Sequence, residues 1–184
     1  MASRVPRRVS RAGARAGLVL LLAGAAACDR TLPQDRDPVP PDTALALPLA
    51  ADTVRDQVLA ELEQYYADFS ARDWARFADH FWPGATLTTV WQPPGDSAVR
   101  VVATTVPDFV AQAPLGPGSR EIFEERMTAA HVFGTATLAL AWARYSARFG
   151  DSGSIEEWMG ADAITLMKHD GRWRIVALAW RQDP

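Results

Sequence analysis

The feature that most constrains this chain is a predicted β-hairpin centred on Asp170-Gly171, close to its C-terminal end. The dipeptide separates two apolar runs, WMGADAITLMK and RWRIVALAW. Asp-Gly between alternating runs is the strongest short-range hairpin signal. A two-residue turn pairs His169 with Arg172 and sets the register of both strands. Both faces of these strands are largely apolar, so we expect both faces of the sheet to be covered.

The same register places a carboxylate, Asp162, on the face that also carries Trp173, Ile175, Ala177 and Ala179. Burial raises the pKa of a carboxyl group, so Asp162 is a candidate general base for proton abstraction or elimination. The alternative is a structural ion pair with Arg181, which is diagonally adjacent on that face.

The first 27 residues have the features of an export signal. Five arginines and no acid precede a short apolar core, which ends in AGAAAC at Cys28. This core is too short to span a bilayer, which needs about 20 residues. The small residues before Cys28, the only cysteine, resemble a bacterial lipobox, in which the cysteine is lipidated. The alternative is an ordinary signal peptide with Cys28 incidental.

Residues 28–51 are rich in proline and charge and predict a disordered tether between a lipid anchor and a folded domain. Removal of residues 1–27 would change the net charge from −3 to −8, because it removes five arginines and no acid. An acidic domain without a basic stripe is a poor candidate for binding nucleic acid. We therefore expect an exported protein that contacts a bacterial membrane, facing the periplasm or the cell exterior, only through its lipid.

Residues 52–184 are long enough for one domain with one core. Apolar spacing predicts helices over residues 53–69 and 73–81 and a short helix over 107–113. β-Type runs cover residues 85–91, 98–106, 123–133, 135–149, 155–168 and 173–181. Helices followed by a long meander of strands predict an α+β fold.

This order of elements resembles the nuclear transport factor 2-like superfamily, in particular its SnoaL-like and ketosteroid-isomerase-like branches. The resemblance rests on RDWARFADHFWPGATL, HVFGTATLALAWARYSARF and KHDGRWRIVALAW. It implies a cystatin-like cone, in which a curved antiparallel sheet wraps around three N-terminal helices and its mouth forms a ligand pocket. Many relatives carry histidines on the last strand, where this chain has Ala177, Ala179 and Arg181. Any function resting on those imidazoles is therefore in doubt here.

Several polar aromatic residues are candidates to line such a pocket with Asp162: Tyr65, Tyr66, Trp91 and Tyr145. The alternative is that they are ordinary core residues. His131 could reach the pocket or be a hydrogen-bonded structural histidine. The three histidines lack the spacing of a metal site, and no phosphate-binding loop or nucleophile motif is present. The sequence therefore predicts neither a metal nor a cofactor.

Leu178 and Trp180 fall on the face opposite Trp173 in the predicted register, and Trp142 extends the same apolar patch. No further segment is available to cover such a patch, so we expect a homodimer that packs sheet against sheet. The sequence leaves two registers, one residue apart, for the strands that flank the loop at residues 150–154. The choice between them decides on which face of the sheet Trp142 lies.

Three functions remain open from the sequence. The first is a lipid-anchored domain that binds a small apolar molecule or acts as an accessory module. The second is an isomerase- or dehydratase-type enzyme with Asp162 as general base and Tyr66 or His131 as donor to an enolate-like oxygen. The third is a protein-interaction module that acts through its outer sheet face. The fold alone does not decide between them.

Overall fold

The computed structural model describes residues 47–91 and 98–183, without the side chain of Trp91. The predicted signal peptide, Cys28 and residues 28–46 of the predicted tether lie outside this part. The helices are α1 (Asp52–Ser70), α2 (Trp74–Asp79), α3 (Val106–Gln112) and a single 3₁₀ turn, η1 (Ala113–Leu115). The strands are β1 (Phe81–Trp91), β2 (Arg100–Thr105), β3 (Ile122–Gly134), β4 (Leu138–Asp151), β5 (Ser154–His169) and β6 (Arg172–Gln182).

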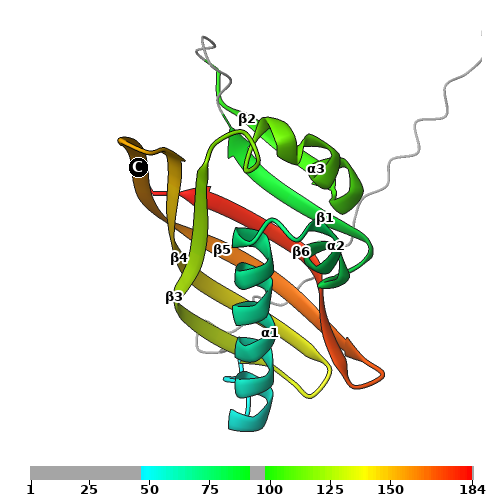
Figure 1. Cartoon of the computed structure of the whole chain (residues 1–184). Helices are drawn as coiled ribbons and strands as arrows, with labels where there is room; N and C mark the ends of the chain where they lie inside the picture. The colour runs from blue at the N-terminus through cyan, green and yellow to red at the C-terminus, as the bar shows by residue number, and fades with distance from the viewer. Residues whose placement is uncertain (1–46, 92–97, 184) are drawn as a thin grey trace, which may run out of the picture. The chain divides into compact units, whose positions relative to one another are not determined.

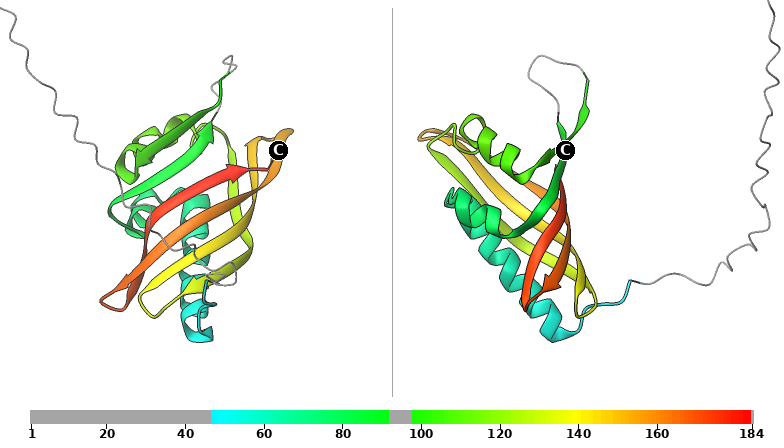
Figure 2. Two further views of the ribbon diagram at one scale, coloured as in Figure 1. Left: turned by 180° about the vertical axis from the view of Figure 1, so that it is seen from behind. Right: turned by 90° about the vertical axis from the view of Figure 1, so that its right-hand side faces the viewer.

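The six strands form one curved sheet in the order β2-β1-β6-β5-β4-β3, and α1 lies across its inner face (Figures 1 and 2). The predicted α+β fold with a curved sheet around helices is confirmed. One pair departs from the predicted antiparallel arrangement, because β1 and β6 pair in parallel. These two strands are far apart in the sequence, and no local turn signal sets their relative direction.

The core forms between α1 and the inner face of the sheet. Helix α1 buries one stripe of side chains against the sheet: Val58, Leu62, Tyr65, Tyr66, Asp68 and Phe69. Trp173 and Ile175 of β6 are buried in the same core, and the indole Nε1 of Trp173 donates to Gln57 of α1 at 3.3 Å. The predicted anchoring of β6 against the first helix is thus observed.

The hairpin turn at Asp170-Gly171 forms as predicted. Both residues have positive φ, 49° and 78°, which matches the primed turn that Asp-Gly favours. His169 pairs with Arg172 across the turn. The local signal therefore predicted the register correctly next to the turn.

A β-bulge at Val176 changes that register farther from the turn. Leu166 pairs with Ile175, but the next residue of β5, Thr165, pairs with Ala177. Two residues of β6 therefore oppose one of β5, and every later side chain of β6 points to the other face. Asp162 faces Trp180 instead of Ala179.

The bulge corrects the predicted faces of β6. Leu178 is buried in the core and Trp180 packs partly buried against it, whereas Ala179 is exposed on the outer face. Leu178 and Trp180 are therefore wrong as dimer-face residues. Trp142 is on the outer face as predicted, with half of its surface exposed (51%).

The edge strand β3 also pairs with residues that precede α1. Leu49 forms an isolated bridge with Phe133, and the amide of Ala50 donates to the carbonyl of Val132 at 3.2 Å. The last residues of the predicted tether thus belong to the sheet edge. Within the described ranges, no helix is long and apolar enough to cross a membrane.

Candidate functional site: a buried carboxylate in an aromatic cavity

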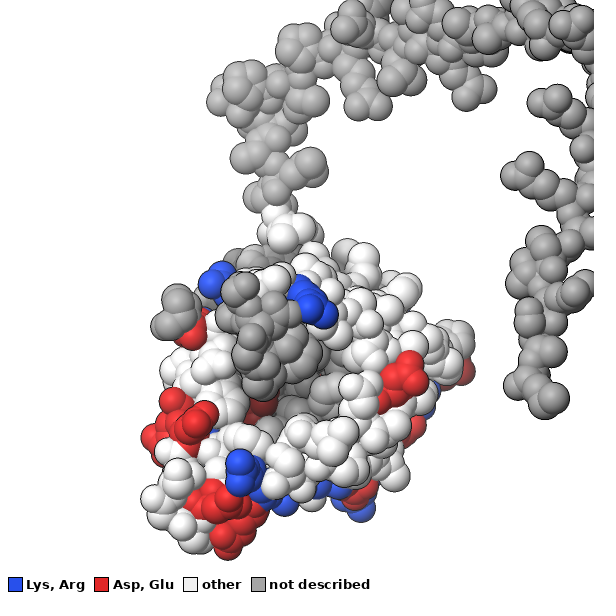
Figure 3. Space-filling view, turned by 90° about the horizontal axis from the view of Figure 1, so that it is seen from above, with Lys and Arg blue, Asp and Glu red and all other residues white. Residues whose placement is uncertain are grey.

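A cavity of about 420 Å³ lies between the inner face of the sheet, α1 and α3. Figure 3 looks onto the end of the domain where the surface is hollowed, and the described atoms beside the hollow are mostly those of uncharged residues. The aromatic side chains of the lining come from helices and strands on every side, and they include Tyr65, Phe109, Phe123, Tyr145, Trp158 and Trp180. An apolar cavity with few polar groups is the usual form of a small-molecule site.

Asp162 of β5 is the most deeply buried polar residue of this lining, with 1% of its surface exposed. Its Oδ2 accepts a hydrogen bond of 2.5 Å from the hydroxyl of Tyr66 on α1. Its Oδ1 has no hydrogen-bond partner among the described residues. One carboxylate oxygen is therefore held by Tyr66, and the other is buried without a hydrogen-bond partner.

Burial raises the pKa of Asp162 to about 7, and the hydrogen bond from Tyr66 acts in the opposite direction. A carboxyl group with this pKa exchanges a proton near neutral pH, which suits a general acid or base.

Glu125 of β3 lines the same cavity. Burial, reinforced by the charge of Asp162, raises its pKa well above the ordinary range. Burial also raises the pKa of Tyr65, Tyr66 and Tyr145, so these phenols remain protonated donors. The cavity therefore combines two acidic groups with tyrosine hydroxyls.

Tyr145 of β4 reaches its position because its neighbour on β5 is glycine. Tyr145 pairs with Gly160, and a Cβ at Gly160 would lie 2.2 Å from the Cζ atom of the tyrosine ring. Only a residue without a side chain allows the ring to lie against this backbone.

The predicted site residues separate into three groups. Asp162, Tyr65 and Tyr145 line the cavity, and Tyr66 contacts it through Asp162. His131 is wrong as a pocket residue, because it pairs with Trp142 on the outer face and is exposed. The side chain of Trp91 lies outside the described part of the structure.

The alternative ion pair between Asp162 and Arg181 does not form. Arg181 is exposed and pairs with Ala161, one residue away from the predicted register. The bulge at Val176 turned the arginine to the outer face. Instead, Asp162 accepts a hydrogen bond from Tyr66, which belongs to a helix distant in the sequence.

Sequence reasoning missed Glu125, Trp158 and Trp180 as cavity residues. Glu125 stands among several charged residues, which suggested a solvated segment, and Trp180 was placed on the wrong face by the unrecognised bulge. The alternation of β3 was an available signal, since Phe123 and Glu125 share one face of that strand.

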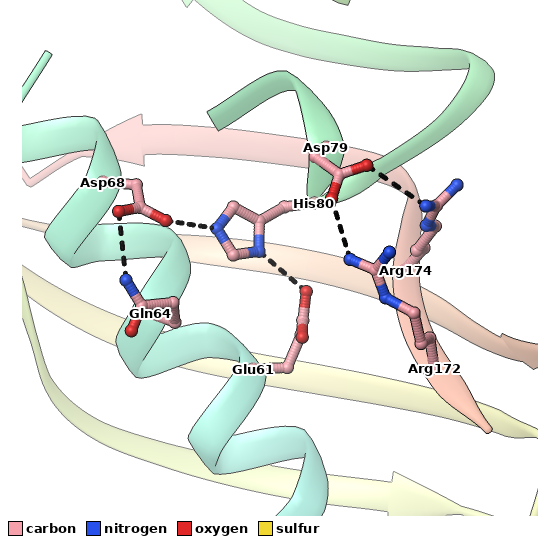
Figure 4. Close-up of polar contacts among 7 residues, drawn as sticks. All are labelled: Glu61, Gln64, Asp68, Asp79, His80, Arg172 and Arg174. Atoms are coloured by element: carbon pink, nitrogen blue, oxygen red, sulfur yellow. Dashed lines mark hydrogen bonds and ion pairs between the residues drawn. The ribbon is translucent and has the colours of Figure 1, made fainter. Parts of the chain in front are cut away.

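A second polar cluster joins α1 to α2 and to the hairpin (Figure 4). Nδ1 of His80 lies 2.7 Å from Oε1 of Glu61, and Nε2 lies 3.0 Å from Oδ2 of Asp68. Burial alone favours the neutral ring, but the two carboxylates outweigh it and raise the pKa of His80. Asp79, next in the chain, pairs with Arg172 and Arg174. None of these six residues lines the cavity, so the cluster lies apart from the candidate site.

No group of three or more His, Cys, Asp or Glu side chains within residues 47–91 and 98–183 is arranged to hold a metal ion. No protein-family model matches the sequence, and no curated protein matches it.

Solved structures with the same fold are numerous. A candidate dehydratase of the NTF2-like family from Streptomyces avermitilis is 13% identical, with a TM-score of 0.58 over 72% of this chain and 98% of that chain. A candidate scytalone dehydratase from Novosphingobium aromaticivorans is 14% identical, with a TM-score of 0.56 over 71% and 84%. A protein of unknown function with a cystatin-like fold from Nostoc punctiforme is 9% identical, with a TM-score of 0.58 over 74% and 96%. The described part of the chain therefore has the cystatin-like fold of the nuclear transport factor 2-like superfamily.

Proposed function

We propose that this domain binds a small organic molecule in the cavity around Asp162. The observation that carries the proposal is the unpartnered Oδ1 of Asp162, a buried residue that lines a cavity of about 420 Å³. An unsatisfied buried acceptor is costly. A ligand that donates to Oδ1 would remove that cost, and the surrounding rings would bury its apolar part.

Ligand capture tests the proposal. The purified protein would be incubated with a mixture of small metabolites, washed and examined by native mass spectrometry. Thr89 lines the cavity, so Thr89→Trp should abolish the captured mass by filling the space. Thr86 is exposed on the same strand, and Thr86→Trp is the matched control that should retain it. Equal capture by both variants would contradict binding in this cavity.

A second candidate is an enzyme in which Asp162 moves a proton. A carboxyl group with a pKa of about 7 and one free oxygen favours this function. Asp162 would remove a proton from carbon next to a carbonyl group, and Tyr145 would donate to the enolate-like oxygen. Tyr66 is then a positioning residue, because its hydroxyl is occupied by Oδ2. Two proteins of similar fold are named as candidate dehydratases.

Solvent-hydrogen exchange tests this second candidate. A panel of small cyclic ketones in D₂O would be followed by NMR with the wild type and Asp162→Asn. Loss of catalysed exchange only in the variant would support a proton-transfer role. Exchange at equal rates in both proteins would contradict it.

We also propose that the chain is exported and lipid-anchored at Cys28, so that binding takes place at a bacterial membrane surface. The arginine-rich start, the short apolar core and the AAAC sequence support this proposal. Expression with radiolabelled palmitate tests it. Label on the wild type and none on Cys28→Ser is expected, and equal label would contradict the anchor.

A further inference from the structure

The charges of the cavity are unbalanced. Its described lining contains two carboxyl groups, from Asp162 and Glu125, and no Lys, Arg or His. Neither carboxyl group forms an ion pair with a described residue. A carboxylate in an apolar site needs a counter-charge or a proton. The described residues supply no counter-charge, so it must come from a proton or from a ligand.

The free oxygen of Asp162 points to a ligand with a hydrogen-bond donor. Tyr66 already donates to Oδ2, and Oδ1 is left without a partner although Asp162 is almost fully buried (1% exposed). A donor that also carries positive charge would bind this oxygen more strongly than a neutral one.

The rings of the lining favour the same class of ligand. Trp158, Trp180 and Tyr145 line the cavity with the carboxyl groups, and the faces of such rings attract organic cations. A neutral apolar molecule would contact the rings but leave the carboxylate uncompensated. An anion would be repelled by the ionised carboxylate of Asp162.

We propose that the ligand of this cavity is an organic amine, whose protonated nitrogen donates to Oδ1 of Asp162 while its apolar part packs against the aromatic lining. The inference rests on the proposed small-molecule binding and adds the chemical class of the ligand.

Three probes of similar size and different charge test the inference: phenethylamine, phenethyl alcohol and hydrocinnamate. The first is a cation at neutral pH, the second is neutral and the third is an anion. Each would be titrated into the full-length protein by isothermal calorimetry. We expect the amine to bind at least about tenfold more tightly than the alcohol, and the anion to bind most weakly.

Single substitutions test whether the charge of Asp162 causes the preference for the amine. Asp162→Asn keeps the shape of the side chain and should reduce amine affinity about tenfold or more, while alcohol affinity changes by less than about threefold. Asp170→Asn removes the same charge at the exposed hairpin turn and should leave both affinities unchanged. Near-ultraviolet circular dichroism would verify folding, and Glu125→Gln provides a second variant if Asp162→Asn is unfolded.

The outcomes separate the two proposals. Alcohol binding as tight as amine binding, or amine affinity that is insensitive to both carboxyl substitutions, overturns the cation inference and leaves small-molecule binding standing. Binding of none of the probes overturns the cation inference, and small-molecule binding also fails if ligand capture is absent.

Discussion

The ring of Tyr145 lies directly against the backbone of Gly160, its partner on the neighbouring strand, with room for no side chain between them. From this position Tyr145 lines the cavity. The geometry of the candidate site therefore depends on a glycine that has no chemistry of its own.

Gly160→Ala should displace the Tyr145 ring, because the added Cβ would lie 2.2 Å from its Cζ atom. We expect a loss of about 1–3 kcal/mol in the free energy of unfolding, measured with urea. Tyr145→Leu removes the clashing atoms, so Gly160→Ala should cost much less in that background. Additive losses in the double variant would mean that the ring is not the obstacle.

Asp162→Asn should stabilise the protein at neutral pH. The pKa of Asp162 is about 7 in the folded protein against an ordinary 3.8. Between these two pH values the folded state therefore binds more protons than the unfolded state. The free energy of unfolding consequently falls as the pH rises through this range. Because the amide does not ionise, we expect a gain of about 1–3 kcal/mol above pH 7 and little gain near pH 4.

Thermal unfolding across this pH range, with Asp170→Asn as the exposed control, measures the difference. Glu125 faces the same cavity and its pKa is also raised, so it contributes to the wild-type slope in the same direction. A gain from Asp162→Asn that does not change with pH would contradict a titrating buried carboxyl group.

His80 should stabilise the contact of α1 with α2 as a charged ring between Glu61 and Asp68. Its pKa is raised in the folded protein, so its contribution is present below the unfolded value of 6.5 and is lost as pH rises through the folded value. The pKa of Asp68 is lowered, because hydrogen bonds from His80 and Gln64 outweigh burial. The contribution of Asp68 is lost at acidic pH.

We therefore expect His80→Gln to lose about 3 kcal/mol of stability in mildly acidic solution and less in alkaline solution. Urea unfolding at several pH values would measure this loss. His169→Gln is the matched control, because that histidine is exposed at the hairpin turn. A loss that grows with rising pH would show that the ring is neutral in the folded protein.

The outer sheet face should carry the dimer contact that we propose for this protein. It exposes four large apolar residues of β4 and β5: Leu138, Leu140, Trp142 and Met167. Patches of this kind mark interaction sites. Trp142→Glu should convert a homodimer to a monomer in sedimentation experiments at micromolar concentration.

Leu115→Glu changes a more exposed apolar residue in η1 and should leave the dimer intact. A wild-type monomer, or a dimer insensitive to Trp142→Glu, would favour a different partner on this face. Capture of another protein that is lost only in Trp142→Glu would support the interaction-module alternative.

The elements that depend on neighbouring residues could be predicted from the sequence alone. The turn at Asp170-Gly171, the alternation of β4 and the stripe of α1 follow from local backbone preferences and side-chain periodicity. Asp162 could be identified because a carboxylate among apolar strand residues is conspicuous in any register.

Only the tertiary structure decided what surrounds that carboxylate. Because of the bulge at Val176, Leu178 and Trp180 lie on the inner face, where the predicted register had placed Ala179 and Arg181. No local sequence signal marks this bulge. Tyr66 of α1 donates to Asp162, and Glu125 of β3 lines the same cavity, although both strand and helix are distant from β5 in the sequence. Such encounters depend on how helix and sheet share one core, because register and packing are set by all the contacts together.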